Sequence, residues 1–320
     1  MIEPLLLSSE SYLVSSLPEI WFAVIMFALT MYIALDGFDF GIGMLYATRD
    51  DEHERETLLA AFGPVWDANE VWLISFGTML LAAFPAVYSR LLSEHYLVAI
   101  GFVLALLFRG IGPELREQSE EERWRRWCDW SFVGGSLFAP LLFGILAGSW
   151  VFDVSELSLP ALLTGVGLVA LSVVTGAAFL AAKTEPELAE EVSRYGVVAT
   201  LAYLGGVVVL LATVVVTDAG GTADAILSIP ALAVVVLSAV AGVVGIVVAR
   251  RGQYRAWLAS AFALPVLLSL LVAMLLFVLF LGFVIFGPWR RLRLCDEDPE
   301  YSYFSYFTIM YSAGLAATFR

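Results

Sequence analysis

The chain has 320 residues, of which 60% are hydrophobic and 15% are charged, whereas soluble domains average about 45–50% and about 25%. Its mean hydropathy of +0.87 excludes a water-soluble fold. Seventeen Lys and Arg against 31 Asp and Glu give a net charge of −14, which argues against nucleic acid as a partner because phosphate contacts need a basic face. Lys183 is the single lysine. An acid-rich, lysine-poor surface predicts a salt-loaded cytoplasm, as in a halophile, because salt screens like charges.

Apolar stretches long enough to cross a bilayer, which takes about 20 residues, recur along the chain. They cover residues 21–46, 71–89, 95–116, 129–151, 160–182, 195–217, 226–249 and 256–289. Apolar residues are continuous in each stretch, without the alternation of barrel strands. The pattern predicts an all-α polytopic membrane protein with about eight or nine transmembrane helices arranged as two four-helix bundles. We expect a first half over 1–151, a second over 152–293, and an aromatic C-terminal tail over 294–320 whose structure the sequence leaves open.

The last stretch, 256–289, allows two interpretations. It is short for two full spans of about 20 residues each, so it forms either a compact helical hairpin or one long tilted helix. The first stretch lacks a preceding basic region, so we expect a retained membrane anchor and not a cleaved signal peptide.

Basic residues gather in alternate loops, which orients the chain because cytoplasmic loops are enriched in Lys and Arg. These residues are Arg49, Arg55, Arg116, Arg123, Arg125, Arg126, Lys183, Arg194, Arg250, Arg251 and Arg255. The alternation predicts a multi-pass protein of the cell membrane with its N-terminus outside.

The first span contains two carboxylates, Asp36 and Asp39, in the sequence LDGFDFGIGM. Residues three apart lie on one helical face, and a charge within a span usually faces a protein interior. The pair is interpreted as a proton-holding site or, alternatively, as a structural ion pair. Gly37 and Gly41 form a small-xxx-small pair that favours close helix packing.

A second polar group, GPVWDANEVW at 63–72, opens the second span. Asp67 and Glu70 allow two interpretations. They either interact favourably with the dipole at the N-terminus of the second span, or they belong to a proton path in the same half of the membrane as Asp36 and Asp39. We expect Trp66, Asn69 and Trp72 to have structural or interface roles, the tryptophans as anchors at the membrane surface.

Arg109 lies about two turns from the inner end of the third span. It either snorkels to the headgroups or neutralises one of the four carboxylates while another remains free to titrate. The acids and one arginine together predict a proton entry route. The charge run 119–126 is interpreted as a solvated loop.

The two histidines, His53 and His95, both lie outside the middle of a span. A bis-histidine haem is therefore not expected in this chain. The two cysteines share no metal-ligand spacing, and we expect neither a metal site nor a catalytic group.

The sequences at 35–44 and 63–72 resemble subunit II of the cytochrome bd-type quinol oxidases. Further similarity lies in FPAVY at 84–88, FRG at 108–110, KTEPEL at 183–188 and RAWLAS at 255–260. The resemblance covers roughly 20–260 in matching order. The family usually has nine spans, so the contracted 256–289 region is a departure.

The resemblance implies a subunit without haem that pairs with a larger subunit I holding haem b and haem d. The complex would oxidise quinol, reduce O2 to water and take protons from the cytoplasm. The aspartate of the family's WD-x-N block maps onto Asp67 and implies a role in proton supply, and a bound quinone is a further possibility.

Two other functions fit the same residues. A proton-coupled secondary transporter would also bury carboxylates and an arginine, although it should show repeats or interrupted helices in both halves. A purely structural membrane subunit would use the acids only for helix packing.

Overall fold

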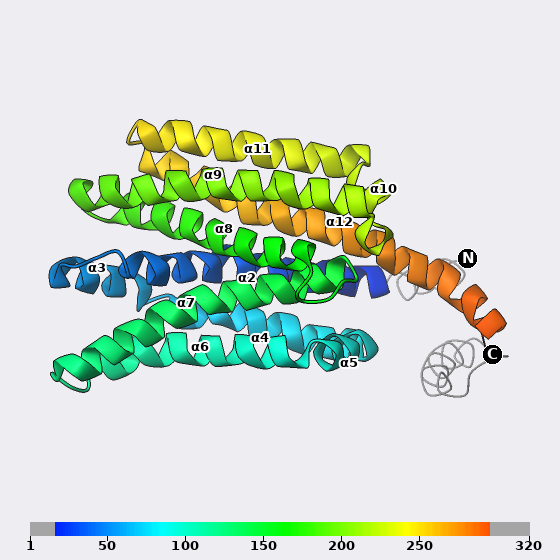
Figure 1. Cartoon of the computed structure of the whole chain (residues 1–320), viewed down its shortest axis with the longest axis horizontal. Coiled ribbons are helices and arrows are strands. Elements are labelled where there is room, and N and C mark those ends of the chain that lie inside the picture. Colours follow the sequence, from blue (N-terminus) through cyan, green and yellow to red (C-terminus); the bar gives the residue numbers. More distant parts are fainter. Residues whose placement is uncertain (1–16, 295–320) are drawn as a thin grey trace, which may run out of the picture. The chain divides into compact units, whose positions relative to one another are not determined.

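The computed structural model describes residues 17–294, and their side chains up to residue 277 (Figure 1). The regular elements of this part are all helical. The long helices are α2 (Leu17–Tyr46), α4 (Trp66–Ala83), α6 (Tyr96–Arg116), α7 (Glu122–Val151), α8 (Leu159–Lys183), α9 (Pro186–Thr217), α11 (Ile229–Arg250) and α12 (Tyr254–Leu294). The shorter helices are α3 (Glu52–Phe62), α5 (Pro85–Glu94), the 3-10 helix η1 (Ala219–Gly221) and α10 (Ala223–Ile226). The predicted all-α membrane fold is confirmed.

Seven of the described helices are long and apolar enough to cross a membrane, or eight if α4 and α5 count as one broken span. Continuous helices suit these stretches because only internal hydrogen bonds satisfy a backbone in lipid. Polar residues set several ends. Ser158 accepts a hydrogen bond from the Ala161 amide at the start of α8, and Asp51 caps α3 in the same way through the Glu54 amide.

The predicted span 71–89 is wrong in its boundaries. The helix α4 ends at Ala83, and α5 leaves it at an angle of 118°. Pro85 explains the break, because proline has no N–H to donate and disfavours helical backbone at the residue before it. Phe84 accordingly has φ −133° and ψ 62°.

Two other regions differ from simple expectation. The connection between the first two spans contains the helix α3, which hydropathy did not reveal. The stretch 256–289 lies within one helix of 41 residues, α12, so the compact hairpin is not formed. The tail at 295–320 lies outside the described residues.

The contacts divide the chain into two units, Met1–Ala273 and Met274–Arg320. In the first, α2 is central and packs against α4, α7 and α8, while α6 packs on α7 and α8 on α9. The described part of the second is the C-terminal portion of α12.

A close approach fixes α2 against α8. A Cβ placed on Gly41 would collide with the Ser172 carbonyl and lie 2.8 Å from the Gly176 Cα, so the two backbones touch here. By contrast, a Cβ on Gly37 would have its nearest neighbour, Thr175 Oγ1, at 3.8 Å. Of the two glycines, Gly41 makes the tight contact.

The arginine-rich connections gather at one end of the helices. In Figure 1, α3 and the α6–α7, α8–α9 and α11–α12 connections all lie at the left end of the first unit. We call this the arginine-rich end.

Candidate functional site

The first and third spans bring three charged side chains together inside the helical bundle. Asp36 and Asp39 of α2 are 0% exposed and Arg109 of α6 is 1% exposed. The Nη2 atom of Arg109 lies 2.7 Å from Oδ1 of Asp36 and 3.8 Å from Oδ2 of Asp39. One guanidinium thus faces two carboxyl groups, a contact that excludes snorkelling of Arg109 to the headgroups.

A backbone contact holds Arg109 at this depth. A Cβ on Gly135 of α7 would collide with the Arg109 backbone and lie 2.7 Å from its Cα. The helix α6 therefore packs directly on α7, and the Arg109 side chain points toward α2.

The second span contributes Asn69. Its Nδ2 donates a hydrogen bond of 2.8 Å to Oδ2 of Asp39, and the residue is buried. Asn69 is the single asparagine of the sequence. The sequence assigned it only a general structural role, whereas the structure gives it a direct bond to one of the two buried acids.

Three aromatic rings surround the guanidinium. The Cζ atom of Arg109 lies 4.5 Å from the ring centroid of Phe40, 5.5 Å from that of Phe62 and 5.9 Å from that of Trp66. The rings of Phe62 and Trp66 are themselves stacked. Cation–π attraction favours a desolvated cation in such a site. Trp66 thus contacts the charged cluster.

The two outer acids, Asp67 and Glu70, lie differently. Glu70 is half-buried and near enough to interact electrostatically with Arg109, Asp36 and Asp39. Asp67 is exposed in the first turn of α4 and interacts electrostatically with Glu70. Trp72 packs its ring edge-on against Phe27 of α2. The four acids therefore form a series from an exposed to a fully buried position.

Several buried polar atoms at the cluster have no hydrogen-bond partner within the described part of the chain. They are Oδ1 of Asp39 and Nε and Nη1 of Arg109, whereas the Tyr32 hydroxyl interacts with Asp36. A cavity of about 10 Å³, about the space of one water molecule, is lined by Tyr32, Gly37 and Phe40 of α2 and by mostly apolar residues of α7 and α8. The site therefore has polar atoms that its own side chains leave without hydrogen-bond partners.

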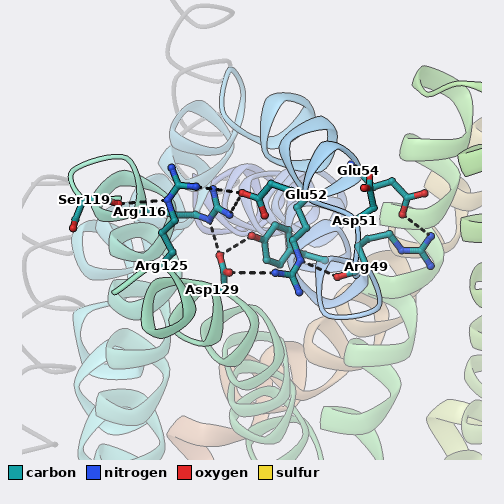
Figure 2. A network of polar contacts seen from close by, with 10 residues as sticks. Arg49, Asp51, Glu52, Glu54, Arg116, Ser119, Arg125 and Asp129 are labelled. Atoms are coloured by element: carbon teal, nitrogen blue, oxygen red, sulfur yellow. Dashed lines mark hydrogen bonds and ion pairs between the residues drawn. The ribbon is translucent and has the colours of Figure 1, made fainter. Parts of the chain in front are cut away.

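A second charged network lies at the arginine-rich end (Figure 2). Arg116 contacts Glu52 at 2.5 Å and Asp129 at 2.8 Å, and the Tyr46 hydroxyl donates a 2.6 Å hydrogen bond to Asp129. Arg125 lies 3.6 Å from the same Glu52 carboxylate. The hydrogen bond from Arg116 holds the pKa of Glu52 below its ordinary value of 4.5.

The structure corrects the interpretation of 119–126 as a loop, although most of the run is exposed to solvent. The helix α7 begins at Glu122, and Arg125 within that run pairs with α3. Sequence reasoning missed this network because its members lie on four separate helices, α2, α3, α6 and α7. The one available signal was the presence of opposite charges at the ends of neighbouring spans.

The two histidines, His53 and His95, lie on different helical segments. His95 is buried at the junction of α5 and α6, where Nδ1 lies 2.7 Å from a Glu156 oxygen. His53 lies in α3. Among the described residues, no three His, Cys, Asp or Glu side chains are arranged to hold a metal ion.

Comparison with known proteins decides the family. The profile described as cytochrome bd terminal oxidase subunit II matches residues 17–313. The chain belongs to this family. The match includes both polar sequences that form the buried cluster, 35–44 and 63–72.

Individual relatives of this subunit II family agree. The chain is 39% identical over 135 residues to cytochrome bd ubiquinol oxidase subunit 2 of Bacillus subtilis, covering 41% of this chain and 39% of the relative. It is 35% identical over 188 residues to cytochrome bd-I ubiquinol oxidase subunit 2 of Escherichia coli K12, covering 53% and 49%. The matched region thus spans about half the length of the curated relatives, or less.

A solved structure supports the fold. A chain of the bd oxidase from Geobacillus thermodenitrificans matches with a TM-score of 0.69 at 16% identity, covering 88% of this chain and 99% of that chain. At this identity the likeness concerns the helical architecture.

Proposed function

We propose that the chain is the haem-free subunit II of a cytochrome bd-type terminal oxidase. With a haem-bearing subunit I it would support oxidation of quinol and reduction of O2 to water, and it would supply a path for proton uptake. Membership of the subunit II family supports the first part. The proton path rests on the Asp36–Asp39–Arg109 cluster.

The observation that carries the proton path is the charge balance of this cluster. Two fully buried carboxyl groups share a single guanidinium. An unpaired buried carboxylate is costly, so a site with one acid more than its cation can neutralise favours a bound proton. When that proton is released, Arg109 and Asn69 stabilise the additional negative charge, because both contact Asp39.

The outer acids extend the path toward the surface. Asp67 is exposed, Glu70 is half-buried, and Asp36 and Asp39 are buried. We infer that a proton enters at Asp67, passes by way of Glu70, and reaches the carboxyl pair on α2 through water. Trp66 and Phe62 shield the guanidinium on the way.

Orientation and surroundings follow from the charges. We infer that the arginine-rich end faces the cytoplasm and that the N-terminus lies outside, in the plasma membrane. The net charge of −14 supports a salt-rich, halophilic habitat.

Cofactors would be held by the partner. The histidines lie in the connecting helix α3 and at the α5–α6 junction, away from the middle of a span. This supports haem b and haem d in subunit I, with any quinone in this chain bound without histidine.

The test uses the complex with subunit I. Asp36→Asn and Asp67→Asn are compared with Asp224→Asn, an exposed acid in α10 outside the cluster. We expect the first two to lower quinol-driven O2 consumption about a hundredfold, the lower end of what a proton-transfer group contributes. The Asp224 variant should be unaffected, and the haem spectrum and subunit ratio should stay normal.

Two results would contradict the proposal. Normal turnover in both cluster variants would remove the proton path, and loss of subunit I from the purified Asp36 variant would indicate a purely structural role. Transport of a solute by vesicles that contain this chain alone would favour a transporter instead.

A further inference from the structure

A second site lies at the arginine-rich end, apart from the carboxyl cluster. The start of α9, the end of α11 and the start of α12 line an open pocket of about 500 Å³. Glu190, Ser193, Arg194, Arg250 and Tyr254 contribute to its wall. We call it the arginine pocket.

Positive charge gathers at the connection between α11 and α12. Residues 225–273 contain three arginines, Arg250, Arg251 and Arg255, and no Asp or Glu, although the chain carries 31 acids in all. Among the described side chains, Arg250 and its neighbours Arg251 and Arg255 form no ion pair. Two of these three are next to each other at the end of α11, where the pocket lies.

The one acid in the wall is neutralised locally. Oε1 of Glu190 lies 2.8 Å from Nη2 of Arg194, one helical turn away. The net charge of the wall is therefore set by Arg250. The amide groups at the start of α12 and the carbonyl groups at the end of α11 carry opposite partial charges, so the side chains decide the sign, and Tyr254 in the first turn of α12 supplies a hydroxyl donor.

The apolar surface next to the pocket favours a ligand that has both an anionic group and an apolar part. On α9, Val198 and Leu201 are exposed directly after the wall residue Val197. On α11, Val243 and Val247 are exposed in the two turns before Arg250. A bound molecule would therefore meet cationic donors at the helix ends and apolar side chains along the helices.

We propose that the arginine pocket binds the phosphate of an anionic phospholipid, whose acyl chains lie along the exposed valines of α9 and α11. Guanidinium groups bind phosphate oxygens with paired N–H donors. Each arginine near an anionic lipid surface contributes about 1 kcal/mol, or about fivefold in affinity. A zwitterionic lipid has no net negative charge to match the excess that Arg250 provides.

The test measures lipid binding to the purified, delipidated complex by native mass spectrometry. The probes are dioleoyl phosphatidylglycerol, dioleoyl phosphatidylcholine and glycerol 3-phosphate. We expect phosphatidylglycerol to bind most tightly, and Arg250→Gln to weaken it about fivefold. The combined Arg194→Gln and Arg250→Gln change should weaken it about 25-fold.

A matched control is available at the same end. Arg126 is 66% exposed and pairs with Glu122 one turn earlier, just as Arg194, at 74%, pairs with Glu190. Arg126 does not contribute to the pocket wall, so Arg126→Gln should leave the affinity unchanged. Arg250→Lys, which keeps the charge, should retain most of the binding.

Three outcomes would overturn the proposal. They are equal binding of phosphatidylcholine and phosphatidylglycerol, equal loss in the Arg126 and Arg250 variants, and unchanged binding in the combined variant. Glycerol 3-phosphate has the headgroup chemistry without acyl chains, so equal affinity for it would overturn the lipid assignment. All four variants change exposed side chains, and normal turnover of each would show that the fold and the oxidase are intact.

Discussion

The guanidinium of Arg109 lies 2.7 Å from a carboxylate oxygen of Asp36, and both side chains are completely enclosed by protein. A buried ion pair is a weak source of net stability, but the loss of one partner leaves an uncompensated charge in a medium of low polarity. Much of the behaviour of the site follows from this asymmetry.

Removal of the Arg109 guanidinium alone should strongly destabilise the complex. We expect Arg109→Leu to lower the stability of the complex by about 3–5 kcal/mol, seen as a large fall in the midpoint of thermal unfolding in detergent. Adding Asp36→Asn to the same chain should recover part of the loss, because the stranded carboxylate is then gone. If the double variant is less stable than Arg109→Leu, the pair is not the reason for the loss.

The bond from Asn69 to Asp39 should also be measurable. Asn69→Leu removes the donor, and a hydrogen bond to a charged group is worth about 1.5–3 kcal/mol. We expect a lower unfolding midpoint together with a changed pH profile of quinol-driven O2 consumption. Thr78→Val in the same helix is the control, because Thr78 is exposed and its hydroxyl donates only to the Ile74 and Ser75 carbonyls of the preceding turn. An unchanged pH profile in Asn69→Leu would contradict a role for Asn69 at the titrating acid.

The helix contact at Gly41 gives a third prediction. Gly41→Ala forces a methyl group into the Ser172 carbonyl, and overpacking of this kind costs about 1–3 kcal/mol. Gly37→Ala is the matched control, since its methyl group would lie 3.8 Å from the nearest atom. Thermal unfolding should separate the two, and equal midpoints would show that α8 moves away at little cost.

The network at the arginine-rich end should respond to acid. The pKa of Glu52 is lowered in the folded chain by its hydrogen bond from Arg116. Its stabilising contribution is therefore complete above the unfolded value of about 4.5 and is lost as the pH falls through the lower, folded value. We expect the amide protons of α3 to exchange faster relative to the rest of the chain as the pH is lowered through this window.

The control for this experiment lies in the same helix. Glu52→Gln should abolish the acid-dependent change in exchange, while Glu56→Gln, an exposed acid of α3, should retain it. Identical pH dependence in the two variants would show that another group controls the docking of α3.

Hydropathy located most of the helices because a backbone in lipid has few alternatives to helix. It placed the second span at 71–89 because apolar residues continue past Phe84, although Pro85 carried the signal for a break. The helix α3 has a mixed composition and is held by charges from other helices, which a linear scan does not relate to one another.

The site was predicted in its composition but not in its pairing. Asp36 and Asp39 lie on one face, so their spacing does not decide which of them meets Arg109. Asp67 and Asn69 are two residues apart, and such residues do not share a helical face. The rotation of α4 about its axis decides between them, and it turns Asn69 toward α2. That rotation depends on packing with α2, which the sequence of α4 alone does not contain.

The contact between Gly41 and Gly176 has a mechanical consequence. With their backbones touching, α2 and α8 resist sliding or turning against each other, and Asp36 and Asp39 lie within two turns of the locked point. The two acids thus lie on a helix segment that is held rigidly against α8. Proton transfer at these acids, as proposed above, would therefore depend on rotation of side chains and exchange with water, and not on movement of α2 against α8.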